Sequence, residues 1–120
     1  MIEIAKPESS VKAQYDLIGK NIVITGGAGF LGRHFAEAVA EMGALPILLD
    51  MGIDYLLDAS KELSGKSVKT ATYTLDICDK ENVQRVINEI VKEHGSIDVL
   101  INSAAFAMKN LQEGGDGFFE

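Results

Sequence analysis

Glycines at positions 26, 29 and 32 form the clearest motif in this chain with a possible binding role. They follow an apolar run and precede a helical pattern, so the stretch predicts a strand, a turn and a helix start. The first glycine allows a sharp turn, the second lets backbone N–H groups approach a pyrophosphate, and the third lets the helix pack closely on the strand. The start of the helix adds unpaired N–H groups and a partial positive charge. The sequence therefore predicts a phosphate-binding loop, with a ligand-free strand–helix turn as the alternative; its residues are Gly26, Ala28, Gly29, Phe30, Leu31 and Gly32.

Asp50 follows the next predicted strand, about 20 residues after the glycines. An acid at this offset accepts hydrogen bonds from the ribose hydroxyls of adenosine. A carboxylate there repels a 2′-phosphate, and no Arg or Lys follows closely, so the sequence favours NAD over NADP. Arg33, at the helix start, is the nearby cation whose side chain can reach a phosphate. The alternative for Asp50 is a turn residue at the end of a strand.

Asp76 and Ile77 follow the third predicted strand. One interpretation is that the carboxylate accepts the adenine amino group while Ile77 packs on the ring. The other is that Asp76 and Asp79 only form the turn that starts the next helix. The spacing alone does not choose between them.

The hydrophobic pattern predicts strands and helices in alternation. A continuous apolar strand at 21–25 is typical of a strand that is buried on both faces of a parallel sheet. The helix at 30–42 is expected to bury a stripe of larger side chains: Leu31, Phe35, Ala38, Val39 and Met42. The other strands are predicted at 45–49, 68–75 and 97–102, and the other helices at 54–63 and 80–94.

This order predicts an α/β fold, a Rossmann-type parallel sheet with strand order 3-2-1-4 and flanking helices. The carboxyl ends of the strands then share one edge of the sheet. Ligands bind in such sheets at the gap between strands 1 and 4. We expect the glycine loop, Asp50 and Asp76 to meet there.

Composition excludes several classes of protein. The 120 residues carry a net charge of −7, from 11 basic and 18 acidic side chains, so neither a nucleic acid nor an anionic membrane is an expected partner. The single cysteine, Cys78, rules out an internal disulfide and fits a reducing compartment, so a cytoplasmic location is expected. There is no apolar run long enough to cross a membrane. No Cys/His cluster has metal-ligand spacing, so no metal is predicted.

Motifs in four places resemble those of the short-chain dehydrogenases/reductases: residues 16–20, 25–32, 76–77 and 97–105. The resemblance implies a nicotinamide cofactor and hydride transfer to or from a carbonyl or alcohol. It also implies that Asp76 holds the adenine with help from the Ile77 backbone. By the same resemblance Asn102 braces the central sheet, and Ala104 lines the nicotinamide ribose.

The chain departs from the family pattern at two positions and leaves the substrate open. Ser103 and Ala105 stand where the family usually has Asn and Gly, and the extra methyl of Ala105 narrows the approach to the cofactor. The glycine spacing is nearer the extended branch of the family, which often acts on nucleotide sugars. A nucleotide-sugar dehydratase or epimerase is therefore an alternative function.

The family's catalytic Tyr, with a Lys four positions later, has no counterpart in the chain. Tyr15, Tyr55 and Tyr73 are followed at that distance by residues other than Lys. We therefore predict the cofactor-binding front part of an oxidoreductase, a truncated product or fragment that is inactive alone and has no catalytic residue of its own. A non-catalytic nucleotide-binding or regulatory module is the second hypothesis.

Three segments are expected along the chain. Residues 1–15 form an N-terminal leader, 16–107 form the NAD(P)-binding half-domain, and 108–120 form a loop-like tail. The fourth strand is an open edge of the expected sheet, and exposed edges and apolar faces favour association. We therefore expect a homo-oligomer, or association through that edge.

Overall fold

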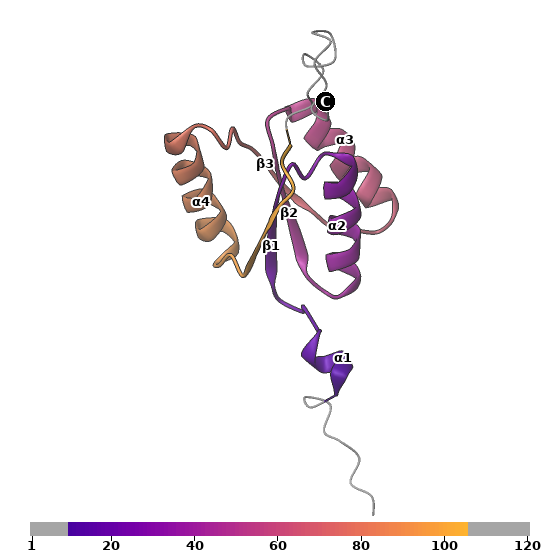
Figure 1. The fold of residues 1–120 in the computed structure, drawn as a ribbon. Coiled ribbons are helices and arrows are strands. Elements are labelled where there is room, and N and C mark those ends of the chain that lie inside the picture. The colour runs from indigo at the N-terminus through magenta and orange to yellow at the C-terminus, as the bar shows by residue number, and fades with distance from the viewer. Residues whose placement is uncertain (1–9, 106–120) are drawn as a thin grey trace, which may run out of the picture.

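The computed structural model describes residues 10–105, and the predicted tail at 108–120 lies outside them. A parallel sheet of order β3-β2-β1-β4 forms its centre (Figure 1). The strands are β1 (Asn21–Thr25), β2 (Leu45–Asp50), β3 (Ala71–Thr74) and β4 (Val99–Asn102). The helices are α1 (Val11–Gln14), α2 (Phe30–Glu41), α3 (Ile53–Gly65) and α4 (Lys80–His94). The predicted fold class and strand order are confirmed.

Helices cover both faces of the sheet. In Figure 1, α2 and α3 lie on one side of it and α4 on the other. Alternating side chains of β1 therefore enter two separate cores: Ile22 and Ile24 face α2 and α3, whereas Val23 faces α4. All of β1 is buried, as expected for a central parallel strand.

Helix α2 buries a different face from the one that its sequence pattern predicts. Its buried residues are Gly32 and Ala36, whereas Leu31, Phe35 and Met42 are exposed. The small side chains let the helix axis approach the strands closely, and the larger residues then lie beside the contact rather than in it. Ala38 is exposed as well, so of the predicted stripe only Val39 packs against the core.

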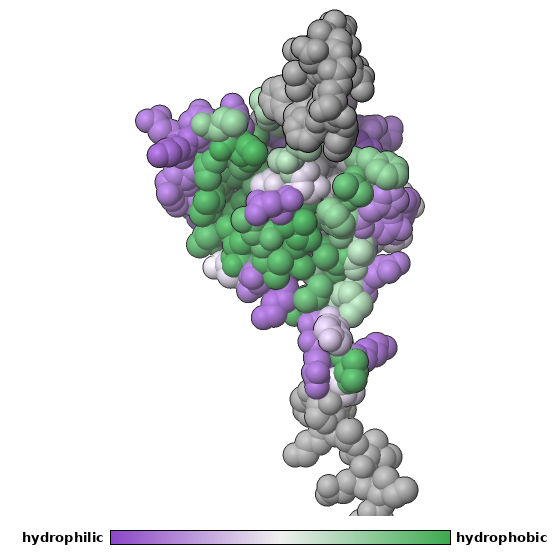
Figure 2. All heavy atoms as spheres, in the orientation of Figure 1, coloured by the Kyte–Doolittle hydropathy of each residue, from purple (hydrophilic) through white to green (hydrophobic). Residues whose placement is uncertain are grey.

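The exposed side chains of α2 belong to a larger apolar surface. Figure 2 shows apolar residues gathered on the viewer's side, where Figure 1 places β4 between α4 and α2. The exposed large apolar side chains of these three elements are Phe30, Leu31, Phe35, Ile87, Val91, Val99 and Leu100.

A polar junction closes the amino end of the β1–β4 pair. The Asn21 backbone N–H donates to the Asp98 carboxylate at 2.8 Å, and the Asn21 side-chain amide donates to the carbonyl oxygens of His94 and Ser96. The Asn21 N–H holds the pKa of the Asp98 carboxyl below its usual value, with a smaller contribution from the Ser96 hydroxyl. This junction ties the end of α4 to the start of the central strand.

Candidate cofactor-binding site

The glycine loop lies against two pieces of backbone. Gly26 has a φ of +63°, and a Cβ there would lie 2.8 Å from the Ala104 Cα. A Cβ on Gly32 would lie 2.7 Å from the Gly27 Cα and even closer to the Gly26 carbonyl oxygen. The first glycine therefore lets the loop meet the end of β4, and the last lets α2 start directly under the loop.

The start of α2 provides donors for an anion. Gly29 is its N-cap and supplies no side-chain hydrogen bond. The N–H groups of the first turn, from Phe30 to Gly32, have no acceptor within the helix. Together with the positive end of the helix dipole, they form a site that suits a phosphate.

Thr25, the last residue of β1, was not among the site residues predicted from the sequence. Its buried hydroxyl accepts hydrogen bonds from the N–H groups of Ser103 and Ala104, at 3.1 and 3.2 Å. These bonds hold the segment after β4 beside the glycine loop. A polar residue at the end of an otherwise apolar buried strand was the signal available in the sequence.

Asn102 was expected to brace the central sheet. It pairs with Thr25 in the strand register, but its exposed side chain makes no hydrogen bond to any residue from 10 to 105. Among these residues the bracing bonds come from Thr25 instead, so the structure differs from the expectation at this position.

Asp50 lies directly beside the loop. One carboxylate oxygen accepts the Ala28 N–H at 3.2 Å, and the other accepts the Met51 N–H at 2.8 Å. Each carboxylate oxygen has two lone pairs, so both keep capacity for further donors such as ribose hydroxyls. The two N–H bonds fix the orientation of the carboxylate.

Asp76 forms a local turn. Its carboxylate accepts the Cys78 N–H at 2.9 Å, and its own N–H donates to the Asn82 side chain at 2.9 Å. Asp79, rather than Asp76, caps α4. Both acids therefore belong to the turn before α4, and this turn leaves Asp76 and the 52% exposed Ile77 at the edge of the cleft.

These parts enclose one cleft of about 620 Å³ at the carboxyl ends of the strands. Most of the predicted site residues line it, including Gly26, Asp50, Asp76 and Ala104. Two predicted residues, Ala28 and Asn102, do not line it, although the Ala28 N–H donates to the Asp50 carboxylate. Other lining residues were not predicted as site residues: Leu49, Met51, Leu75, Cys78, Ser103 and Ala105.

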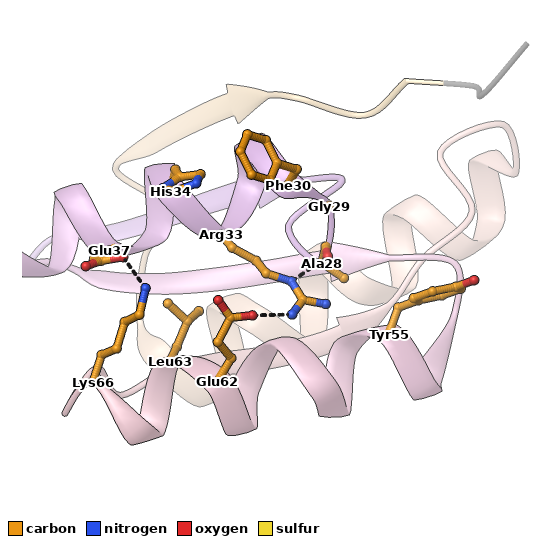
Figure 3. A pocket seen from close by; sticks show the side chains of 10 residues that line it. All are labelled: Ala28, Gly29, Phe30, Arg33, His34, Glu37, Tyr55, Glu62, Leu63 and Lys66. Carbon is orange, nitrogen blue, oxygen red and sulfur yellow. Dashed lines mark hydrogen bonds and ion pairs between the residues drawn. The ribbon is translucent and has the colours of Figure 1, made fainter.

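The Arg33 side chain does not point into this cleft. It lies in a second groove, between α2 and α3 (Figure 3), where its Nε donates to the Ala28 carbonyl oxygen at 2.8 Å. One guanidinium nitrogen, Nη1, bonds to Asp58 at 2.9 Å and to Glu62 at 2.5 Å. Burial lowers the pKa of Arg33, but the bonds to these carboxylates outweigh it and raise the pKa overall. The sequence placed Arg33 within reach of a cofactor phosphate; the structure bonds it to α3 instead.

Residues 10–105 contain neither a metal-binding cluster nor a membrane-spanning helix. Their His, Cys, Asp and Glu side chains form no group that could hold a metal ion. Their helices include none with the length and apolar character to cross a membrane.

Comparison with known proteins identifies the class. The sequence pattern of the short chain dehydrogenase family matches residues 20–116. A relative from Listeria innocua, an NAD-dependent glycerol dehydrogenase, is 35% identical over 99 residues, which are 82% of this chain and 38% of that protein. The chain belongs to the short-chain dehydrogenase/reductase family.

Solved structures agree with this assignment. An NAD⁺-bound xylitol dehydrogenase superposes with a TM-score of 0.70 at 32% identity, over 75% of this chain and 35% of the other. The L-sorbose reductase of Gluconobacter frateurii, complexed with NADPH and L-sorbose, gives 0.70 at 30% identity, over 77% and 35%. The chain therefore spans little more than a third of the length of these two proteins.

Proposed function

We propose that this chain is the dinucleotide-binding part of an NAD-dependent oxidoreductase that acts on a carbonyl or an alcohol. The observation that carries the proposal is the single cleft in which the start of α2, Asp50 and the end of β4 meet. Family relatives that are dehydrogenases and reductases support the reaction class. Bound NAD would supply the nicotinamide carbon that accepts or gives up the hydride.

Each part of the cleft suits one part of the cofactor. The first turn of α2 would hold the pyrophosphate, because its N–H groups have no intrahelical acceptor. Asp50 would accept bonds from the adenosine ribose. The edge formed by Asp76 and Ile77 would take the adenine, and Ala104 would lie beside the nicotinamide ribose.

The preference for NAD over NADP follows from charge. A 2′-phosphate on the adenosine ribose would place further negative charge beside the Asp50 carboxylate. No cation lines the cleft within residues 10–105, since Arg33 lies in the neighbouring groove. One relative binds NAD⁺ and another NADPH, so the preference is specific to these residues and not to the fold.

Catalysis is not proposed for the 120 residues alone. No Tyr in the sequence has a Lys four positions later, so the chain lacks the pair that would move a proton to or from the substrate. We expect cofactor binding without hydride transfer. A nucleotide-binding module without catalysis is the competing function, and carbonyl reduction by the purified chain would contradict both.

Calorimetric titration with NAD and with NADP tests the cofactor proposal. Replacing Asp50 by Ala removes charged hydrogen bonds that are worth about 1.5–3 kcal/mol, so NAD affinity should fall roughly 10- to 100-fold. Asp54→Ala is the matched control, because Asp54 is an exposed acid just beyond the cleft, in the first turn of α3. A folded chain that binds no NAD, or equal losses in both variants, would refute the proposed site.

Cys78 offers an independent reporter of the same site. It is the only cysteine of the chain, it is exposed, and it lines the cleft next to Ile77. Saturating NAD should slow its reaction with a thiol-specific disulfide reagent, and Asp50→Ala should weaken that protection. Unchanged labelling rates at saturating NAD would place the cofactor elsewhere.

We propose that the chain self-associates through the β4 edge and the apolar surface around it, where Leu31 and Leu100 are 59% and 54% exposed. Leu100→Lys should then shift sedimentation toward a smaller species, and a monomer at all concentrations would contradict the proposal. A cytoplasmic location is proposed from the single cysteine.

A further inference from the structure

Ala28 connects Arg33 to the ribose side of the cleft. Its N–H donates to the Asp50 carboxylate at 3.2 Å, and its carbonyl oxygen accepts the Arg33 Nε at 2.8 Å. The carboxylate and the guanidinium therefore bond to the same loop residue, one at each of its backbone polar groups. A phosphate placed beside Asp50 would lie close to the Arg33 charge.

That charge is already neutralised from α3. Asp58 and Glu62, one helical turn apart, both bond to Nη1 of Arg33. The Arg33 side chain is only 17% exposed, whereas those of Asp58 and Glu62 are 72% and 47% exposed, so the acids reach over the guanidinium from the solvent side. Figure 3 shows Arg33 between Ala28 and Glu62, on the line from the loop to α3.

The balance of charge around the loop is consequently negative. The Arg33 cation faces two carboxylates, and Asp50 adds another on the cleft side. The other cation that lines the groove, Lys66, is bonded to Glu37 at 3.1 Å. A 2′-phosphate would thus meet an excess of negative charge although an arginine lies next to the loop.

We infer that Asp58 and Glu62 determine cofactor specificity, because they hold Arg33 on α3 and so withhold it from the 2′-phosphate of NADP. This inference rests on the proposed preference for NAD and adds a second layer to it. Asp50 rejects the phosphate directly, and the two acids of α3 reject it by engaging the cation that would otherwise bind it. They are positioning residues, since they act through Arg33.

The test is the ratio of the NADP and NAD dissociation constants, measured by calorimetry on the purified chain. Asp58→Asn with Glu62→Gln keeps the side-chain shapes and removes both charges. The double variant loses two negative charges and releases the positive charge of Arg33, several ångströms from the phosphate and near a protein surface. NADP should therefore bind more tightly relative to NAD, and the ratio should fall about tenfold. Affinity for NAD should change less than threefold.

Adding Arg33→Gln to the double variant separates the two possible causes. If Arg33 binds the phosphate, the gain should disappear and the ratio should return to the wild-type value. A gain of the same size without Arg33 would overturn the inference, because it would come from the removed charges alone. An unchanged ratio in the double variant would overturn it as well.

Single substitutions provide the matched control. Glu62→Gln should give part of the effect, whereas Glu37→Gln removes one acid from the same groove without touching Arg33, and it should change the ratio less than twofold. Equal effects of the two would overturn the inference.

Circular dichroism checks folding, and the single variants suffice for the test if the double variant is unstable. Absence of NAD binding by the wild type refutes the proposed function, whereas normal NAD binding with no change in the ratio refutes only the role of Asp58 and Glu62.

Discussion

Replacing Gly32 by Ala is the sharpest test of how α2 packs against its own loop. The added Cβ would lie 2.7 Å from the Gly27 Cα and 2.9 Å from the Gly27 carbonyl carbon. Both are backbone atoms of a loop that hydrogen bonds hold in place: the Gly27 N–H donates to the Leu49 carbonyl oxygen at 3.0 Å, and the Gly29 N–H donates to that of Gly26 at 3.0 Å. The methyl group therefore cannot be accommodated by a side-chain rotation.

The opposing effects have known sizes. Alanine favours a helix over glycine by about 1 kcal/mol. Overpacking costs about 1–3 kcal/mol, and each loop hydrogen bond lost as the backbone shifts costs about 1 kcal/mol more. The expected net loss is about 2–3 kcal/mol of the free energy of unfolding, a large part of the roughly 5–15 kcal/mol typical of a domain.

Urea unfolding followed by circular dichroism measures this loss. With a slope of about 1–3 kcal/mol per molar urea, the midpoint should fall by roughly 1 M or more. Gly65→Ala is the matched control, because a Cβ there meets nothing within 4 Å, and this variant should be slightly more stable than the wild type. Equal or higher stability of the Gly32 variant would refute the close approach of α2 to the loop. NAD affinity should also fall in the Gly32 variant, since the displaced loop carries the proposed phosphate site.

Two further predictions concern the stabilising contacts of α4. The pKa of Asp98 is lowered by the Asn21 N–H, so its contribution to stability is present above its ordinary pKa of 3.8 and is lost as the pH falls through the lower folded value. Asp98→Asn should therefore reduce stability near pH 7, and the difference from the wild type should shrink in urea titrations near pH 3; a constant difference would contradict the assignment. The Tyr73 hydroxyl bonds to Glu93 and lies 3.0 Å from the His94 Nε2, and burial followed by the Glu93 bond raises its pKa. Tyr73→Phe should cost about 0.5–1.5 kcal/mol at pH 8 by chemical denaturation, and a variant of unchanged stability would show that this contact does not hold α4 on β3.

The sequence was sufficient for the sheet because its signals there are strong. An unbroken apolar strand, β1, and a helix with a clear cap, α4 after Asp79, were predicted at their observed bounds. The edge strands were predicted too long: β3 covers Ala71–Thr74 and β4 covers Val99–Asn102. Just before β4, the Asp98 carboxylate accepts a hydrogen bond from the Asn21 N–H, and no local sequence pattern indicates a bond between residues so far apart.

The buried face of α2 was predicted wrongly for a physical reason. The helix carries large apolar residues on one side and small residues on the adjacent side, and a hydrophobicity pattern favours the large ones. Close packing on the strands selects Gly32 and Ala36 instead. Which of two neighbouring faces is buried depends on the distance between helix and sheet, which the sequence pattern does not contain.

For the site as well, contacts between residues close in sequence could be predicted, whereas contacts between distant segments could not. The spacing predicted that the glycine loop and Asp50 lie together, as they do, because their relation depends on one strand–helix–strand unit. The roles of Thr25 and Arg33 depend on segments distant in sequence: the end of β4 for the threonine, and α3 for the arginine. Residue types alone did not reveal either set of contacts.

The position of β4 has a consequence for how the cleft is assembled during synthesis. The bond between Asn21 and Asp98 joins residues 77 positions apart, whereas β1 pairs with β2 over a much shorter separation. A ribosome that adds about 5–20 residues per second needs roughly 4–15 s to cover that interval. During that time β1, the most deeply buried strand of the finished sheet, presents an unpaired edge. The segment after β4, which lines one side of the cleft, is therefore synthesised last. The nascent chain is most exposed to misassociation in the seconds before β4 is made.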